Sequence, residues 1–299
     1  MVLTDNMRGA ALMTGAMFAF TVNDTFLKAL SDQLPLFQTI FLRGIGVIAC
    51  LTIMAALMRQ LNFRQSRRDW FLIVIRGLSE LAAAYFFLTA LFNMPIAAAS
   101  AILQALPLTV SLAGALFLGE ALGWRRLVAI LIGFVGVLLI VRPGGADFNF
   151  YSVYAVLSVA CVTLRDLVVR RMNKSVPSLL VSLVAAICVT VGAGVACLFA
   201  TWVPLQGMAM AQIGGATIFV VFGYIFSVAA MRVGDISFVA PFRYVSLLVA
   251  LILGFAVFGE VPRVLTLVGA GIVVATGLFT LFRERRLNLR RRTIPDRIR

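Results

Sequence analysis

MPIAAASAILQALPLTVSLAGALFLGE, residues 94–120, decides the fold because the chain carries a second version of it. Shifted by 140 positions, it aligns without a gap on residues 234–260, GDISFVAPFRYVSLLVALILGFAVFGE. Five of the 27 pairs are identical, which is a weak signal by itself. However, both segments are helix-length apolar runs that end in Gly-Glu and precede another such run. We therefore interpret the chain as two copies of one unit.

A second match at nearly the same shift supports the duplication. At a shift of 142, four residues of the first copy fall on similar residues of the second, namely Thr21, Asp24, Lys28 and Pro35 on Thr163, Asp166, Arg170 and Pro177. Pro35 and Pro177 each open an apolar segment, so the two copies also begin their next segments alike.

The composition places the chain in a lipid bilayer. It has 299 residues, of which 62% are hydrophobic and 13% charged, with a mean hydropathy of +1.04. Soluble domains carry about 25% charged residues. Apolar runs long enough to cross a bilayer as helices recur at 8–29, 35–57, 69–91, 95–117, 124–142, 151–172, 177–200, 211–232, 236–257 and 263–282. The sequence predicts an all-α integral membrane protein with ten transmembrane helices.

The net charge of +14 sets the orientation of these spans. With the N-terminus in the cytoplasm, 19 of the 26 Lys and Arg residues fall in the segments on the inner side. This asymmetry is the positive-inside rule, so we expect a multi-pass protein with both termini cytoplasmic. The positive charge therefore does not require a nucleic-acid partner.

Five spans in each copy force the second copy to enter the membrane upside down. We expect a first repeat over residues 8–142, a second, inverted repeat over residues 151–282 and a basic cytoplasmic tail at 283–299. Glu120 then lies at the inner side and Glu260 at the outer side. Inverted repeats place a substrate site near the membrane midplane, between the halves, which indicates a transporter.

The third span carries Arg76 and Glu80, four residues apart. Glu80 is the deepest carboxylate, and a charge at that depth costs about 3 kcal/mol or more unless it is paired or hydrated. One interpretation is an ion pair with Arg76 or with Arg43 of the second span, which locks the helices. The other is a role in substrate binding or proton coupling.

The first span carries Asp24 and Lys28 at a spacing that lets the two side chains meet on one helix face. This pair either reaches the membrane interface at a helix end or lines the pathway. The neighbouring Asn23 is a candidate lining residue.

The fourth and ninth spans carry polar groups at equivalent depths. Gln104 either forms an interhelical hydrogen bond or contacts the ligand, and Pro107 frees a carbonyl nearby. In the second copy, Arg243 and Tyr244 follow Pro241 within the span, and we interpret them as cavity-lining residues. Tyr224 of the eighth span lies at a similar depth.

The motifs that the sequence lacks exclude several functions. It contains no histidine, so neither an HExxH zinc site nor a Ser-His-Asp triad exists here. It also contains no Walker A sequence. We expect a protein that is not an enzyme and needs no cofactor and no metal.

These features resemble the drug/metabolite transporter superfamily of EamA type, whose members have two five-helix halves. The resemblance rests on ALFLGE ending at Glu120 and FAVFGE ending at Glu260, and it covers about residues 8–282. Val261-Pro262 departs from the longer loop after Glu120. Within the superfamily the chain is similar to the YddG-type amino-acid exporters. The resemblance implies a cavity walled by spans 1, 3, 4, 6, 8 and 9, and export of aromatic and other neutral amino acids across a bacterial inner membrane.

We accordingly expect a monomeric exporter of broad range that works by alternating access. Its partners are an amino-acid substrate and the lipid bilayer. We expect Asn23, Gln104, Tyr224 and Tyr244 to share the cavity, with Arg243 or Arg76 attracting the substrate carboxylate. The pairing of Glu80 with an arginine suits a fixed charge better than a proton carrier, which favours facilitated diffusion. The alternatives are an exporter of other small metabolites or drugs and, from another class, a scaffold or lipid-modifying enzyme.

Overall fold

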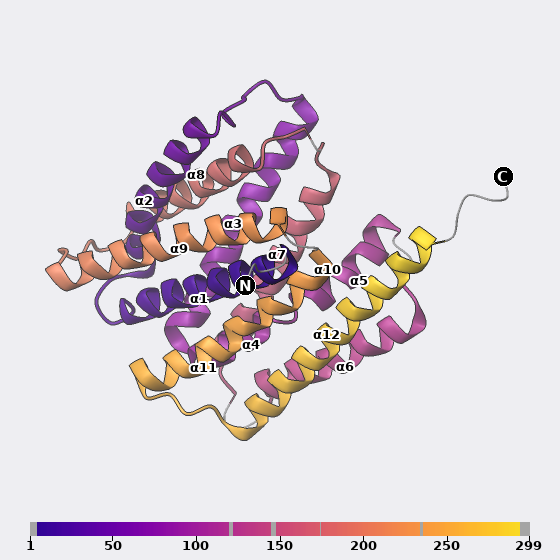
Figure 1. Ribbon diagram of the computed structural model, residues 1–299. Coiled ribbons are helices and arrows are strands. Elements are labelled where there is room, and N and C mark those ends of the chain that lie inside the picture. The colour runs from indigo at the N-terminus through magenta and orange to yellow at the C-terminus, as the bar shows by residue number, and fades with distance from the viewer. Residues whose placement is uncertain (1–4, 120–121, 145–147, 174, 234–235, 294–299) are drawn as a thin grey trace.

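A computed structural model describes residues 5–119, 122–144, 148–173, 175–233 and 236–293, and within them all regular structure is helical (Figure 1). The helices are, in chain order, α1 (Asp5–Ala29), α2 (Leu36–Leu57), α3 (Arg67–Asn93), α4 (Ile96–Leu103), α5 (Leu106–Leu118), α6 (Trp124–Val141), α7 (Tyr151–Arg171), α8 (Ser178–Cys197), α9 (Gly207–Val233), α10 (Ile236–Val239), the 3₁₀ segment η1 (Ala240–Tyr244), α11 (Val245–Phe258) and α12 (Val264–Thr293).

These helices form ten candidate membrane spans within the described residues, by length and apolar composition. The prediction of an all-α, ten-span membrane protein is therefore confirmed. Glu120 lies outside the described residues. The last helix differs from its predicted span, because α12 continues to Thr293 instead of ending near residue 282. Arginine favours helices and no proline intervenes before Pro295, so the helix extends into the predicted tail.

The fourth and ninth spans are each broken into two pieces. The fourth span changes from α4 to α5 at Gln104 and Ala105, and Pro107 occupies the first turn of α5. The ninth span passes through η1, which contains Pro241, before α11 begins. Proline has no backbone N–H and interrupts the helical hydrogen-bond ladder, so both breaks follow from the sequence.

The packing of the helices is symmetric under exchange of the two copies. α1 packs most extensively against α9, and their equivalents α7 and α3 form the next most extensive pair. α2 pairs with its own equivalent α8, and α6 pairs with α12. Figure 1 shows α6 and α12 together at one side of the bundle, away from α2 and α8. This pattern fits the inverted repeat.

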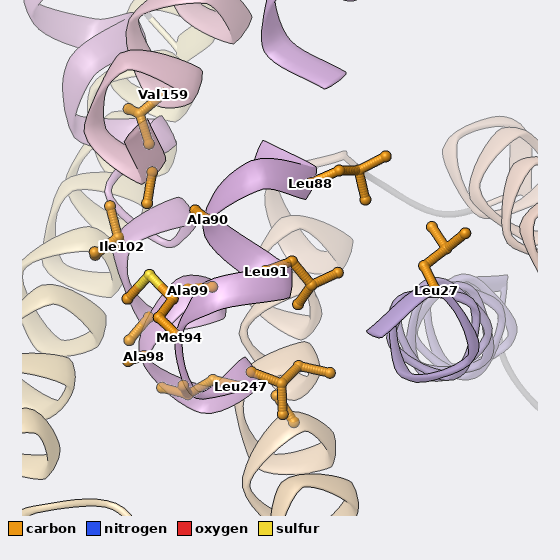
Figure 2. Close-up of a cluster of buried hydrophobic side chains, with 14 of the residues drawn as sticks. Leu27, Leu88, Ala90, Leu91, Met94, Ala98, Ala99, Ile102, Val159 and Leu247 are labelled. Carbon is orange, nitrogen blue, oxygen red and sulfur yellow. The ribbon is translucent and has the colours of Figure 1, made fainter. Parts of the chain in front are cut away.

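A large apolar cluster joins the copies at the end of the bundle where α3 turns into α4. The charge distribution predicts this end to be extracellular, and we call it the outer end. Figure 2 shows the turn at Met94 with Leu91 before it and Ala98 after it, close to Leu247 of α11. Leu27 of α1 belongs to the same cluster and is buried.

Both copies end their broken span with the same glycine conformation. Gly119 follows α5 with φ 68° and Gly259 follows α11 with φ 65°. The N–H of Gly119 donates to the carbonyl of Gly114, and the N–H of Gly259 donates to the carbonyl of Phe255. The N–H of Glu260 donates to the carbonyl of Gly254. The glycine of the repeated Gly-Glu therefore marks a left-handed helix end in both copies, and in the second copy Glu260 follows it directly.

We predict that Gly119→Ala and Gly259→Ala each lower the free energy of unfolding by about 1 kcal/mol, because a Cβ disfavours the left-handed conformation. Gly123→Ala is the matched control, since Gly123 has a φ of −69° and open space around it. Unfolding in mixed detergent micelles measures all three variants. Equal losses for Gly123→Ala and Gly259→Ala would contradict the assignment.

Candidate functional site

Four charged side chains from two helices meet inside the bundle. Arg165 of α7 donates from Nη1 to both oxygens of Glu80 on α3, at 3.2 and 3.1 Å. Its Nε donates to Asp166 at 3.0 Å. Arg76 of α3 lies 3.8 Å from Glu80 and donates to the carbonyl of Val181 at 3.2 Å. Glu80 therefore has an ion pair, as one interpretation of the sequence held, but its principal partner is Arg165.

These charges are not sealed off from solvent. The side chains of Glu80 and Arg165 are each 23% exposed, and that of Asp166 is 36% exposed. Arg243 of η1 is exposed, although it lies within electrostatic range of Arg165 and Asp166. Charges of both signs on α3, α7 and η1 are therefore partly exposed within the membrane-spanning part, in agreement with the depth argument for Glu80.

The first helices of the two copies present the same local geometry. Asn23 of α1 donates to Asp24 at 2.8 Å, and its equivalent Arg165 donates to Asp166 at 3.0 Å. In both copies a side chain donates to the carboxylate of the next residue. Asn23 is buried and Asp24 half-buried. The symmetry of the fold thus extends to the polar groups predicted as lining residues.

Gln104 connects the two broken spans. Its amide nitrogen lies 2.6 Å from Ser246 Oγ of α11 and 3.5 Å from the carbonyl oxygen of Arg243. The interhelical hydrogen bond that we considered from the sequence is present, and its partner Ser246 carried no signal of its own. Thr21 of α1 also reaches the Ser246 carbonyl, at 3.5 Å.

The two tyrosines lie in different places. Tyr224 of α9 contacts Phe20 edge to face, with ring centroids 5.5 Å apart, and lines a cavity that also contains Arg76 and Glu80. Tyr244 is buried against α12, where a Cβ at Gly277 would overlap its hydroxyl. Its hydroxyl has no hydrogen-bond partner within the described part of the chain. Tyr224 therefore lies beside Arg76 and Glu80, whereas Tyr244 packs against α12.

Two cavities approach the charged groups. One of about 110 Å³ lies between α2, α3, α8 and α9 and contains Arg76, Glu80 and Tyr224. Another of about 440 Å³ lies toward the inner ends of α7 and α8 and shares Arg76 and Ser182 with the first. The resemblance implied walls from other spans, whereas spans 2 and 7 contribute most of the smaller cavity here.

A larger cavity lies elsewhere. It has a volume of about 730 Å³ and is lined mainly by apolar side chains of α3, α5 and α7. Its polar groups include Thr109 and Thr163, which are bonded to each other at 2.7 Å, and Arg171. Because none of the charged side chains around Glu80 lines this cavity, we place the candidate site at the charged groups rather than in the larger space.

The outer end is closed by an ion pair between the two copies. Lys28 of α1 lies 2.6 Å from Glu260, and it also donates to the carbonyl of Met94. The other oxygen of Glu260 accepts the N–H of Ile96 at the start of α4, at 2.9 Å. The predicted pairing of Lys28 with Asp24 is wrong. Lys28 lies nearer the outer end than Asp24, where the left-handed turn at Gly259 delivers a competing carboxylate.

The fold and these polar groups define a multi-pass membrane protein with charges of both signs held inside it, which is the arrangement of a small-molecule transporter. Residues 7–142 match the EamA-like transporter family. A solved crystal structure is similar over 93% of this chain and 98% of its own, with a TM-score of 0.63 and 22% identity.

Two relatives extend the comparison along the whole chain. An S-adenosylmethionine uptake transporter of Rickettsia prowazekii is 24% identical over 269 residues, which are 89% of this chain and 90% of the relative. The pseudopaline exporter CntI of Pseudomonas aeruginosa is 28% identical over 303 residues, covering 96% of this chain and all of the relative. The family match covers less than half of the chain, and both relatives are named as transporters. The comparisons therefore indicate a small-molecule transporter that is similar to EamA-like proteins.

We predict that the coupling between Arg165 and Glu80 exceeds that between Arg76 and Glu80. Charge-assisted hydrogen bonds contribute about 1.5–3 kcal/mol. Arg165 lies at hydrogen-bond distance from Glu80, whereas Arg76 lies 3.8 Å from it. Double-mutant cycles with Glu80→Gln, Arg165→Gln and Arg76→Gln measure both couplings as free energies of unfolding in mixed micelles. A coupling for Arg76 as large as that for Arg165 would contradict the geometry.

Proposed function

We propose that the protein exports amino acids of broad range across a bacterial inner membrane by alternating access. The observation that carries the proposal is the accessible cluster of opposite charges around Glu80. An amino-acid zwitterion brings one carboxylate and one ammonium, and this cluster offers arginines for the first and Glu80 or Asp166 for the second. A few polar groups in a largely apolar surround favour weak and adaptable binding.

The asymmetry between the two ends supports alternating access. The outer end is held by the Lys28–Glu260 ion pair and the apolar cluster behind it. Toward the inner end, the cavity of about 440 Å³ reaches Arg76. This combination suits a state that receives substrate from the cytoplasm. Opening the outer end requires the ion pair to separate.

Each proposed site residue has a role that its surroundings support. Arg243 is better placed than Arg76 to attract the substrate carboxylate. Arg76 already lies 3.8 Å from Glu80 and donates a hydrogen bond to the Val181 carbonyl. Tyr224 borders the cavity beside Glu80. Gln104 holds the broken fourth and ninth spans together, and Asn23 orients Asp24. The hydroxyl of Tyr244 lies against α12. We keep Tyr244 among the proposed site residues because it is adjacent to Arg243.

The energy source that fits best is the amino-acid gradient itself. Glu80 accepts two hydrogen bonds from Arg165 and lies near Arg76, so it acts as a fixed charge of the site. A proton carrier would have to release these partners in each cycle. Facilitated diffusion needs no such step.

A second candidate is transport of a larger metabolite. The relatives named above are an S-adenosylmethionine uptake transporter and a pseudopaline exporter. Their names differ in both molecule and direction, so either kind of substrate is open to this chain. A binding screen with S-adenosylmethionine beside the amino acids separates the two candidates.

We predict that reconstituted vesicles loaded with labelled phenylalanine, threonine or methionine show protein-dependent efflux without a change of lumenal pH. Gln104→Ala lowers the efflux because it cuts the link from α4 to α11, while the protein stays folded in detergent. Val135→Ala, at an exposed position of α6, is the control and leaves the efflux unchanged.

Absence of efflux for every member of a full amino-acid panel would refute the amino-acid substrate. A pH change that accompanies efflux and disappears in Glu80→Gln would refute facilitated diffusion. Normal efflux by Gln104→Ala would remove Gln104 from the site.

A further inference from the structure

Arg43 is a charge inside a span whose hydrogen-bonding capacity is unused. It lies in α2, well inside the helix that begins at Leu36, and makes neither a hydrogen bond nor an ion pair with any described residue. Its Nε is buried without a partner. Asp24, Glu80 and Tyr224 lie only within longer electrostatic range. A guanidinium carries five N–H donors, so this side chain is open to an acceptor from outside the protein.

The cavity of about 110 Å³ lies directly against Arg43. Three of the other polar groups of its wall already have partners. Arg76 donates to Val181, Glu80 accepts from Arg165, and Thr190 donates to the Ala186 carbonyl at 2.7 Å. At about 30 Å³ for each water molecule, the space is large enough for the charged head of an amino acid but not for a large side chain.

We propose that Arg43 binds the carboxylate of the transported molecule in this cavity. The proposal rests on the function proposed above and names the group that the site recognises. The planar guanidinium matches a carboxylate with two parallel hydrogen bonds. Glu80 lines the same cavity and receives the ammonium, while Arg243 and Arg76 contribute the surrounding positive field.

The position of the cavity explains how one head group serves many side chains. Most of the remaining wall is apolar, and part of it is formed by the small residues Ala84, Ala185 and Ala186. Glu80 also accepts a hydrogen bond from Arg165 of α7. A ligand held by its head beside Arg43 and Glu80 leaves a large side chain outside this cavity of about 110 Å³. The charged residues of this cavity therefore recognise only the head group of the ligand.

The test compares phenylalanine with phenylalanine amide, which lacks the negative charge, in binding to the purified protein in detergent. The wild type binds phenylalanine at least about tenfold more tightly, as expected for loss of charge-assisted hydrogen bonds. Arg43→Gln brings the two affinities to within about twofold, and Arg43→Lys gives an intermediate ratio. Arg8→Gln removes the same charge at an exposed position of α1 and keeps the wild-type ratio.

A wild-type ratio near one overturns the proposal, and this arm needs no variant to fold. A wild-type ratio retained by Arg43→Gln overturns it as well. Arg43→Lys keeps the positive charge and replaces Arg43→Gln in the test if Arg43→Gln yields no folded protein. If Arg43→Lys binds the two ligands with the full wild-type affinity ratio, the two parallel hydrogen bonds are refuted.

Acetate and chloride at constant ionic strength separate this site from the choice of substrate. Thermal stabilisation of the wild type by acetate that is lost in Arg43→Gln supports the carboxylate site. If no amino acid binds in the same experiments, that finding refutes the amino-acid substrate and leaves the carboxylate site in place. Chloride that stabilises as strongly as acetate, without discrimination between phenylalanine and its amide, marks a site for a free inorganic anion and overturns the assignment to the transported molecule.

Discussion

An unpaired charge in the hydrocarbon layer costs about 3 kcal/mol or more, and this cost governs how the bundle is built. Seven charged side chains lie well inside the spans, and they are the arginines Arg43, Arg76, Arg165 and Arg243 and the carboxylates Asp24, Glu80 and Asp166. Each must face a partner or water rather than lipid. The helices α1, α2, α3, α7 and η1 are therefore turned so that these groups approach one another, and long apolar side chains such as Ile53, Leu131 and Phe255 remain on the outside.

The duplication solves this problem with one design used twice. In each copy a donor and a carboxylate stand next to each other on the first helix, and a span broken by proline ends in a left-handed glycine. The copies are not identical, however. The equivalent of Arg43 at the shift of 142 is Ala185, which carries no charge. The charged residues that line the smaller cavity therefore all come from the first copy. This departure from symmetry is where we place the substrate carboxylate.

Much of the fold follows from local patterns in the sequence. The ten spans, the kinks at Pro107 and Pro241 and the glycine helix ends are set by apolar run length and by backbone chemistry. The pairings of Glu80 with Arg165 and of Lys28 with Glu260 could not be found in the same way. They join helices more than 80 residues apart and depend on the rotation of each helix about its axis. For Lys28, the near spacing to Asp24 pointed to a local partner, whereas packing delivers a distant one.

The most direct measurement is the efflux of labelled amino acid while the outer end is held shut. Cysteines replace Lys28 and Glu260 in a protein without Cys50, Cys161, Cys188 and Cys197, and a short cleavable reagent joins them in reconstituted vesicles. Single-cysteine variants treated alike are the control. The account predicts that efflux stops when the two are joined and resumes when the reagent is cleaved. Efflux at the full rate with the outer end joined would contradict the account.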